Sequence, residues 1–488
     1  MKNIILMFLL FVGIGRCVHN GPAPEAKARG AASVSVGAGA LVERGPLQDC
    51  KLTDFLKRDF GDLDFICNEN YVHILAKNQP APAANDLTPL QIGSFNLLHL
   101  GDSQAPMKNF ALVAMIMNQW DLVGAQELMP INSAEARYNQ VSNDIIKNDN
   151  VELPAKSTVN YPGYLNLLKE LRALDPTWAL IIQPRAQGEG STGEMAGFYY
   201  RGKKLQPMEW KYCADLPAGL NLACVARVPD AQRKLMSRNA FVARFKTAKW
   251  DFITITTHVR FREADDPKDL KAQGDELCAG VQACDWNNEN VGRFYEVKAV
   301  MDQAKALKKF SADIIFMGDF NLEVTSNTQE LWDAALRGSD GMTVHQTEMT
   351  TLGGAKNELV SNYDHFIFNE QVTKNCDPQS IKTFDFTRAR INSAGPGLIG
   401  TIQQNLTDAG RSNLLNQHTQ FVNALVRPVT RTTQGTGAQK FRPVNSKEAE
   451  AILAGCRTAY AKMSGKDMTA LMELISDHIP IHMSCAVH

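Results

Sequence analysis

The sequence has almost no net charge. Its 51 Lys and Arg residues face 52 Asp and Glu residues, which gives a formal net charge of −1. This balance argues against a protein held on nucleic acid or membrane mainly by its overall field, so any handling of phosphate must be local. Hydrophobic residues make up 44% and charged residues 21% of the 488 residues, which is typical of globular proteins and excludes a wholly disordered chain.

Long hydrophobic runs are missing beyond the first residues. Residues 1–17 combine the positive charge of Lys2 with an apolar run that begins at Ile4, which predicts a signal peptide too short to span a bilayer. We therefore expect a secreted or periplasmic protein without stable membrane insertion. A lipid anchor on Cys17 is an alternative, but Arg16 directly before it disfavours that modification.

The chain has ten cysteines but no CxxC motif, which leaves a zinc ribbon or a thioredoxin-type site without support. In an exported protein the cysteines are candidates for disulfides. Sequence alone does not fix their connectivity. Close spacing favours the pairs Cys50–Cys67, Cys213–Cys224 and Cys278–Cys284, with Cys456–Cys485 as a longer closure and Cys376 left over.

No repeat of fixed period is visible, and composition divides the chain into unequal parts. Residues 18–45 are rich in Ala, Gly and Pro and predict a flexible tether, and 46–87 form an N-terminal extension. Residues 88–488 then form one large domain, with insertions near 261–292 and 392–444. Strand-like and helix-like segments alternate in this domain, which predicts a β-rich core with helices packed outside it.

Several predicted strands end in acidic, amide or imidazole side chains. Taken singly, such a residue is more often a cap, a turn or a surface group than a functional one. Loops that follow buried strands can nevertheless hold reactive groups rigidly. The residues concerned are Asn96, Glu127, Glu194, His258, Asp319, Asn321, Asp364, Asp477 and His478.

The order of these residues resembles that of the deoxyribonuclease I-like family, the endonuclease/exonuclease/phosphatase superfamily. The resemblance covers roughly residues 90–483 and rests on IIFMGDFN, a later strand with Tyr-Asp, and the terminal SDHIPI. It implies an α+β fold, a four-layer α/β/β/α sandwich of two mixed β-sheets flanked by helices. It also implies that the domain over 88–488 is catalytic.

The resemblance implies a metal site. Carboxylate and amide oxygens suit Mg²⁺ or Mn²⁺, and a structural Ca²⁺ is a further option. Glu127 is expected to be the principal ligand. The other expected ligands are Asn96, Asp477 and Asp319.

Two histidines are the expected acid–base groups, because an imidazole titrates near neutral pH. The resemblance pairs His478 with Asp364 and His258 with Glu194, although Ala196 stands where the family's Glu194 strand has a tyrosine. Which histidine acts as base stays open. Three further residues complete the expected site: Asp319 and Asn321, which position the nucleophile and grip the phosphate, and Arg238, which contacts phosphate.

The sequence thus predicts a secreted, monomeric, Mg²⁺-dependent endonuclease that hydrolyses DNA, with RNA as a further substrate. NYDHF differs from the Cys-Asp-Arg motif of inositol polyphosphate phosphatases, which disfavours that branch. The alternatives are a phosphoesterase acting on a phospholipid, as sphingomyelinases do, or on a phosphoinositide, and an inactive binding protein on the same scaffold.

Overall fold

The structure of the chain is a computed structural model. It describes residues 64–68, 71–75, 88–100, 110–129, 163–183, 187, 193–214, 221–261, 267–281, 284, 290–345, 348–353, 358–386, 426–428, 441–443 and 475–487. The predicted signal peptide (1–17) and tether (18–45), with most of the predicted insertion near 392–444, lie outside these residues.

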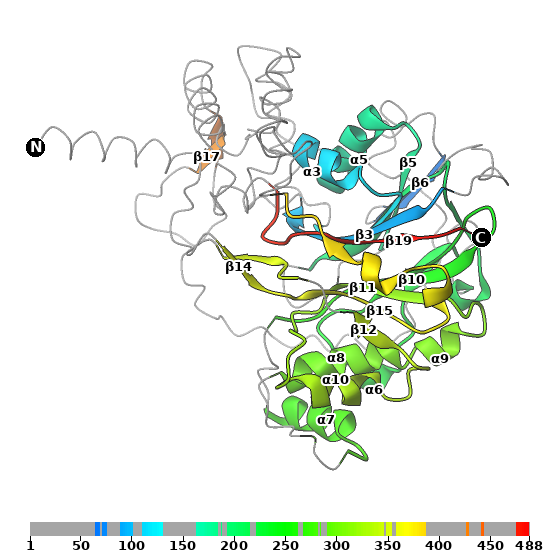
Figure 1. Cartoon of the computed structure of the whole chain (residues 1–488). Coiled ribbons are helices and arrows are strands. Elements are labelled where there is room, and N and C mark those ends of the chain that lie inside the picture. Colours follow the sequence, from blue (N-terminus) through cyan, green and yellow to red (C-terminus); the bar gives the residue numbers. More distant parts are fainter. Residues whose placement is uncertain are drawn as a thin grey trace, which may run out of the picture.

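The first sheet has eight strands in the order β1-β2-β5-β6-β4-β3-β19-β16. Strands β3 and β4 run parallel, and the other neighbours are antiparallel. The late strand β19 lies directly beside β3 (Figure 1). The extension at 46–87 contributes β1 and β2 to this sheet. The strands are β1 (Asp64–Asn68), β2 (Tyr71–Leu75), β3 (Leu90–Leu100), β4 (Leu122–Leu128), β5 (Trp178–Ile182), β6 (Met195–Arg201), β16 (Lys382–Thr383) and β19 (Ile481–Cys485).

The second sheet has seven strands, in the order β12-β15-β11-β10-β9-β7 with β8 also paired to β9. It too is mixed, because β10 and β11 run parallel while β15 and β9 flank them antiparallel. The strands are β7 (Gln206–Pro207), β8 (Ala223–Val225), β9 (Phe241–Lys246), β10 (Asp251–His258), β11 (Ile314–Asp319), β12 (Thr343–His345) and β15 (Asp364–Phe368).

Helices cover the outer face of each sheet (Figure 1). Helices α3 (Phe110–Met117) and α5 (Gly163–Leu174) pack on the first sheet. The second is covered by α6 (Asp230–Arg233), α7 (Pro267–Leu277), α8 (Val291–Met301), α9 (Ala304–Leu307) and α10 (Gln329–Leu336). The remaining elements are η2 (Lys211–Cys213), β13 (Thr351–Gly353), β14 (Glu358–Ser361), η3 (Val372–Lys374), η4 (Pro378–Ser380), β17 (Val426–Pro428) and β18 (Phe441–Pro443).

Three buried apolar layers hold this arrangement together. One lies between α3, α5 and the first sheet, with Leu168 in it; the next lies between the sheets and includes Phe198 and Phe366. The third joins the second sheet to α8 and α10 through residues such as Trp332. Three layers of burial between four layers of structure confirm the expected α/β/β/α sandwich. A sheet buried on both faces also explains the near-continuous apolar run of β11, Ile314–Asp319.

Gly318 shows how tightly the second sheet is built next to Asp319. Its φ is +148°, and a Cβ atom at this position would lie 1.9 Å from the carbonyl oxygen of Thr257. Any side chain would therefore force β10 and β11 apart at the point where both end. The glycine of the GDFN motif is a packing requirement of the strand that carries the motif.

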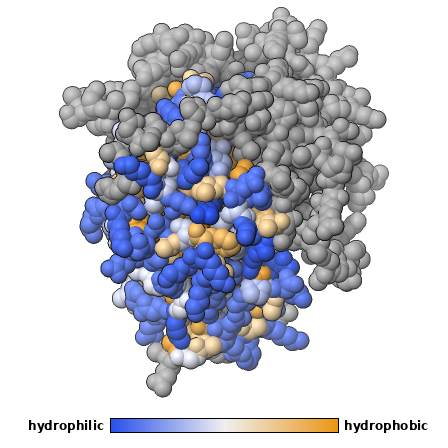
Figure 2. Space-filling view, turned by 90° about the vertical axis from the view of Figure 1, so that its right-hand side faces the viewer, coloured by the Kyte–Doolittle hydropathy of each residue, from blue (hydrophilic) through white to orange (hydrophobic). Residues whose placement is uncertain are grey.

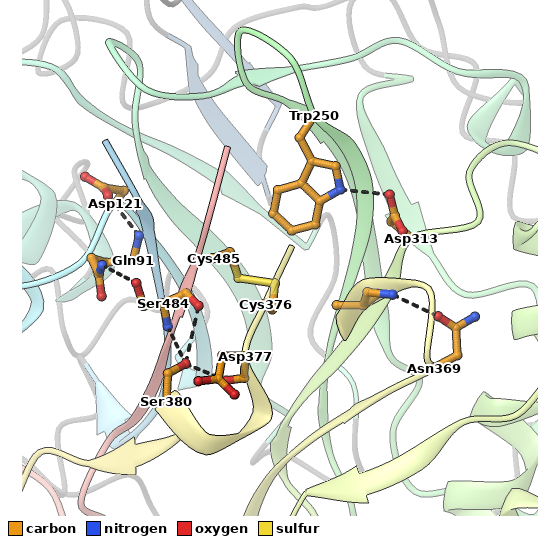
Figure 3. The surroundings of a disulfide bond; sticks show 11 residues. Gln91, Asp121, Trp250, Asp313, Asn369, Cys376, Asp377, Ser380, Ser484 and Cys485 are labelled. Atoms are coloured by element: carbon orange, nitrogen blue, oxygen red, sulfur yellow. Dashed lines mark hydrogen bonds between the residues drawn. A yellow bond between two sulfur atoms is a disulfide. The ribbon is translucent and has the colours of Figure 1, made fainter. Parts of the chain in front are cut away.

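Three disulfides lie within the described residues. Cys213–Cys224 and Cys278–Cys284 are confirmed, and the predicted Cys50–Cys67 bond lies outside the described side chains. The predicted Cys456–Cys485 bond is wrong, because Cys485 pairs with Cys376, the cysteine left over (Figure 3). The reason is sheet assembly: β19 returns the chain's end to the core, where residues 376 and 485 also form a β-bridge. Spacing along the chain cannot reveal a neighbour brought in by the sheet.

The surface of the described part is mixed. Figure 2 shows mainly hydrophilic residues on one face, with small hydrophobic patches scattered among them. No helix among the described residues has the length and apolarity to cross a membrane.

Candidate active site

The expected polar residues meet where the parallel strands of both sheets end. In the first sheet, Asn96 and Glu127 lie near the carboxyl ends of β3 and β4. In the second, His258 and Asp319 end β10 and β11 and are paired in register. Asp364 begins β15 and pairs with Asp319 on its other side. Because parallel strands place their carboxyl ends at one edge, each sheet brings its own residues together.

The side chain of Asn96 connects the two sheets. Its Nδ2 donates a hydrogen bond to Glu127 Oε1 at 2.9 Å and another to Asp319 Oδ2 at 3.0 Å. Its Oδ1 accepts the backbone N–H of Leu98 at 3.0 Å, which fixes the orientation of the amide. In this arrangement a nitrogen, not an oxygen, faces both carboxylates. Coordination of a cation through Asn96 Oδ1 therefore requires the amide to turn.

The first histidine of the site is held by a glutamate. His258 Nδ1 is hydrogen-bonded to Glu194, whose Oε1 also lies 3.0 Å from Arg238 Nε. The other ring nitrogen, Nε2, lies 3.5 Å from Asp319 Oδ2. Burial alone would lower the pKa of His258, but the negative charge of Glu194 and its hydrogen bond outweigh this and raise the pKa to about 9. The positive charge of Arg238 acts in the opposite direction.

The second histidine has the same kind of partner. His478 Nδ1 and Asp364 Oδ2 are 2.7 Å apart, and His478 Nε2 lies 3.4 Å from Asp319 Oδ2. Burial alone would lower the pKa of His478, but the surrounding carboxylates, led by Asp364, raise it well above its usual value. Both histidines thus direct Nε2 at one carboxylate oxygen while a second carboxylate holds Nδ1.

Asp319 and Asn321 are positioned by the turn of the GDFN motif. The backbone N–H of Asn321 donates to Asp319 Oδ1 at 2.8 Å, and the Asn321 Nδ2 donates to the carbonyl oxygen of Val259 at 2.8 Å. Burial raises the pKa of Asp319, and the nearby charge of Asp364 adds to this effect. The positive charges of the two histidines oppose it. The turn therefore fixes Asp319 at the centre of the site.

Backbone strain concentrates around these residues. Five non-glycine residues have positive φ in the described part of the chain, and four belong to the site: Leu98 (+43°), His99 (+48°), Glu127 (+57°) and Asn321 (+50°). Such conformations cost of order 1–3 kcal/mol each and persist only where surrounding contacts enforce them. One such contact is the backbone N–H of His99, which donates to Glu127 Oε2 at 2.9 Å.

Glu127 is a carboxylate kept in its charged form. Burial alone would raise its pKa, but the charges of His258 and His99 and the hydrogen bond from Asn96 lower it to about 2. Glu127, Glu194 and His258 form one group that could hold a cation, since one ligand atom from each lies within 4.8 Å of the others. Carboxylate oxygens are hard ligands that suit Mg²⁺ or Mn²⁺. Two carboxylates and one imidazole therefore fit a divalent cation.

Only some of the predicted metal ligands lie close together. Glu127 belongs to the group just described, and Asp319 adjoins it through the shared Asn96 donor. Asp477 does not belong to that group; it adjoins His478 and contributes to the raised pKa of this histidine.

Two supporting hydroxyls were not anticipated. Ser476 Oγ donates to the carbonyl oxygen of Asn96 at 2.6 Å and accepts the N–H of His478 at 3.1 Å. Thr350 Oγ1 accepts the N–H of Asp364 at 3.3 Å. Ser476 stands inside the SDHIPI motif, so its position could have suggested a role. Thr350 lies in a stretch without any motif, and only the folded chain places it here.

Comparison with known proteins gives structural similarity but no sequence relatives. No protein-family model and no curated protein matches the chain. Among solved structures, a mannosyl-6-phosphatase of Bacteroides thetaiotaomicron VPI-5482 is 13% identical, over 81% of this chain and 99% of that one, with a TM-score of 0.35. D. rerio TDP2 complexed with a single-strand DNA product is 14% identical, over 81% and 98%, with a TM-score of 0.33. The beta toxin of Staphylococcus aureus is 11% identical, over 60% and 89%, with a TM-score of 0.34.

These scores carry no argument about function. The strand order and layers described above have the architecture that the resemblance to the deoxyribonuclease I-like superfamily implied.

Proposed function

We propose that the chain is a metal-dependent phosphodiesterase, an endonuclease that hydrolyses DNA and also accepts RNA. The observation that carries the proposal is the arrangement around Asp319 Oδ2, which lies 3.5 Å from His258 Nε2 and 3.4 Å from His478 Nε2. Two imidazoles, each oriented by its own carboxylate, thus flank one point. Asn96 Nδ2 reaches the same oxygen at 3.0 Å.

Phosphodiester hydrolysis needs this kind of arrangement. An attacking water must lose a proton, and the departing oxygen must gain one, on opposite sides of the phosphorus. His258 and His478 supply two separate proton-transfer groups: as an imidazolium one donates a proton to the departing oxygen, and as a neutral imidazole the other accepts the proton of the attacking water, a form that the positive charge of a bound cation would favour. Glu194 and Asp364 hold the two Nδ1 atoms, which leaves each Nε2 for this transfer. A site that only activates a water molecule would need one histidine–carboxylate pair, not two.

The remaining residues bind and orient the phosphate. We propose that Asn321 and Arg238 grip the scissile phosphate, with Asp319 positioning the attacking water. As ligands of a Mg²⁺ or Mn²⁺ ion we propose Glu127 and Asp319 first, with Asn96 and Asp477 completing the set. When bound, the cation supplies positive charge for the phosphoryl oxygens.

We also propose that the protein is exported by residues 1–17 and acts as a monomer. The disulfides Cys213–Cys224, Cys278–Cys284 and Cys376–Cys485 support export, because disulfides persist mainly in oxidising compartments.

One incubation tests the activity. Purified protein with supercoiled plasmid and Mg²⁺ should convert the plasmid to nicked and linear forms, and a chelator should stop it. Sphingomyelin and phosphoinositide vesicles run in parallel test the lipid alternatives. Glu127→Gln, which keeps the shape of the side chain but removes its charge, should lose the activity and also the rise in melting temperature that Mn²⁺ causes. An intact plasmid together with phosphocholine or phosphate release would overturn the nuclease proposal.

A further inference from the structure

Phe261 stands out among the apolar side chains at the surface. It is 58% exposed, more than the other large hydrophobic residues that are exposed in the described part of the chain, Leu174, Met349 and Val360. A single exposed apolar residue is ordinary. Phe261, however, follows the site residue His258 by three positions, and a charged side chain lies against its ring.

That charged side chain is Arg293 of helix α8. Its Cζ lies 5.4 Å from the centre of the Phe261 ring, a cation–π contact. Its Nη1 donates a hydrogen bond to the carbonyl oxygen of Asn321 at 3.0 Å. The side chain of Asn321 in turn donates to the carbonyl oxygen of Val259 at 2.8 Å. Asn321 is therefore hydrogen-bonded to Arg293, which lies against the ring, and to Val259, which lies two residues before Phe261.

Helix α8 also fixes the residue before the ring. Arg260 is buried, and its Nε lies 2.6 Å from Oε1 of Glu296, which is 1% exposed. The backbone N–H of Arg260 donates to Glu296 Oε2 at 3.1 Å. One turn of α8 thus clamps the chain at Arg260 through Glu296 and supports the Phe261 ring through Arg293. The ring is exposed, but hydrogen bonds and the cation–π contact connect it to the site.

We propose that the Phe261 ring, backed by Arg293, is a stacking platform for an unpaired nucleobase of the substrate, next to the phosphate held at Asn321. This inference rests on the proposed nuclease function and adds a substrate class, single-stranded or locally unpaired nucleic acid. Bases stack on aromatic rings regardless of their identity, and arginine strengthens such sites. The positive charge beside the ring also suits a phosphate backbone. Insertion into a lipid surface would require a broader apolar face than one ring backed by the Arg293 guanidinium.

The test compares two oligonucleotides of equal length and charge. One is single-stranded DNA, and the other has abasic tetrahydrofuran residues throughout its cleaved region. For Phe261→Ala, the preference for the base-bearing substrate, measured as the ratio of the two kcat/KM values, should fall roughly tenfold. Phe261→Trp should restore the preference, because indole also stacks. Leu174→Ala, at an exposed apolar residue on helix α5 of the opposite layer, should leave both kcat/KM values unchanged.

Each other outcome counts against the proposal. Equal losses on both substrates, or no loss on either, would overturn the platform while leaving the nuclease function intact. If Phe261→Ala weakened sedimentation with sphingomyelin vesicles and left the oligonucleotide ratio unchanged, the ring would contact lipid instead. If the unmodified protein nicked the plasmid but cleaved neither oligonucleotide, this inference alone would be overturned, whereas failure on the plasmid as well would overturn the proposed function too. Melting temperatures of the variants check that the ratio does not report misfolding.

Discussion

His258 and His478 reach the same carboxylate from different sheets. His258 ends β10 of the second sheet and is held by Glu194, which directly precedes β6 of the first. His478 precedes β19 of the first sheet and is held by Asp364 of β15 in the second. Each pair therefore crosses between the sheets, in opposite directions. Neither sheet contains a complete pair, so each histidine–carboxylate contact exists only once the sandwich has formed.

The two pairs differ in what surrounds the carboxylate. Glu194 is shared between His258 and Arg238, so one negative charge faces two positive ones. Around His478 the charges that raise its pKa are negative and come from Asp364, Asp319 and Asp477. The first pair thus shares its carboxylate with an arginine, whereas the second is a histidine among several carboxylates.

Removing either imidazole should have the largest effect. We expect His258→Ala and His478→Ala each to lower kcat at least ~10²-fold, the usual scale for general acid–base catalysis. Plasmid nicking under single-turnover conditions measures this loss. Circular dichroism spectra of the variants serve as the control. A near-normal rate in one variant would mean that its histidine is not needed for catalysis, although the two pairs have similar geometry.

Neutralising the carboxylate of each pair should lower kcat by different amounts in the two pairs. Glu194→Gln removes a carboxylate that contacts both His258 and Arg238, whereas Asp364→Asn removes a partner of His478 and leaves Asp319 and Asp477 near it. We therefore expect both variants to lose about 10- to 100-fold in kcat, with Glu194→Gln the worse of the two. Equal losses, or the reverse order, would show that the balance of charge at Arg238 is unimportant.

A third histidine, His365 in the second sheet, should affect the stability of the fold and not the rate of catalysis. His365 is fully buried, and burial lowers its pKa from 6.5 to about 4. Between these two pH values the unfolded chain binds a proton at this histidine and the folded chain does not. The neutral His365 therefore leaves the free energy of unfolding undiminished above about pH 6.5 and lowers it as the pH falls toward 4. His365→Gln, whose amide can still donate to the carbonyl oxygen of Leu322, should remove up to about 1.4 kcal/mol of destabilisation per pH unit in that window. Urea titrations at pH 7, 6 and 5 measure it; an unchanged pH dependence would contradict it.

The smallest effect is expected at Ser476, which belongs to one pair only. Its hydroxyl joins the N–H of His478 to the carbonyl oxygen of Asn96, and the His258 pair has no equivalent link among the described contacts. Ser476→Ala should cost about 1 kcal/mol in the free energy of unfolding and a few-fold in kcat. Ser476→Cys has a side chain of similar size with a weaker donor, so its stability and kcat should lie between those of the unmodified protein and those of Ser476→Ala. A loss as large as that of His478→Ala would make this hydroxyl part of the chemistry itself.

Several residues of the candidate site could be predicted because each stands within a short local motif. GDFN, the Tyr-Asp strand and SDHIPI each place a reactive residue at a strand end, and the structure brings Asp319, Asp364 and His478 together as the resemblance implied. The orientation of the Asn96 amide could not be predicted, because it depends on two carboxylates from different sheets. Cys485 was assigned the wrong partner for the same reason: spacing along the chain says nothing about strand order.

The sequence by itself determined which chemical groups were available and which strands would carry them. Apolar runs such as Ile314–Asp319 specify buried strands, and the polar residue at the end of each run marks its reactive edge. Only the tertiary structure decided which groups meet. Packing the two sheets face to face brings Glu194 to His258 and Asp364 to His478, and packing α8 on the second sheet brings Arg293 to Phe261. The physical reason is that hydrophobic burial fixes the layers, whereas hydrogen bonds and charges act over a few ångströms and select partners only after the layers are in place.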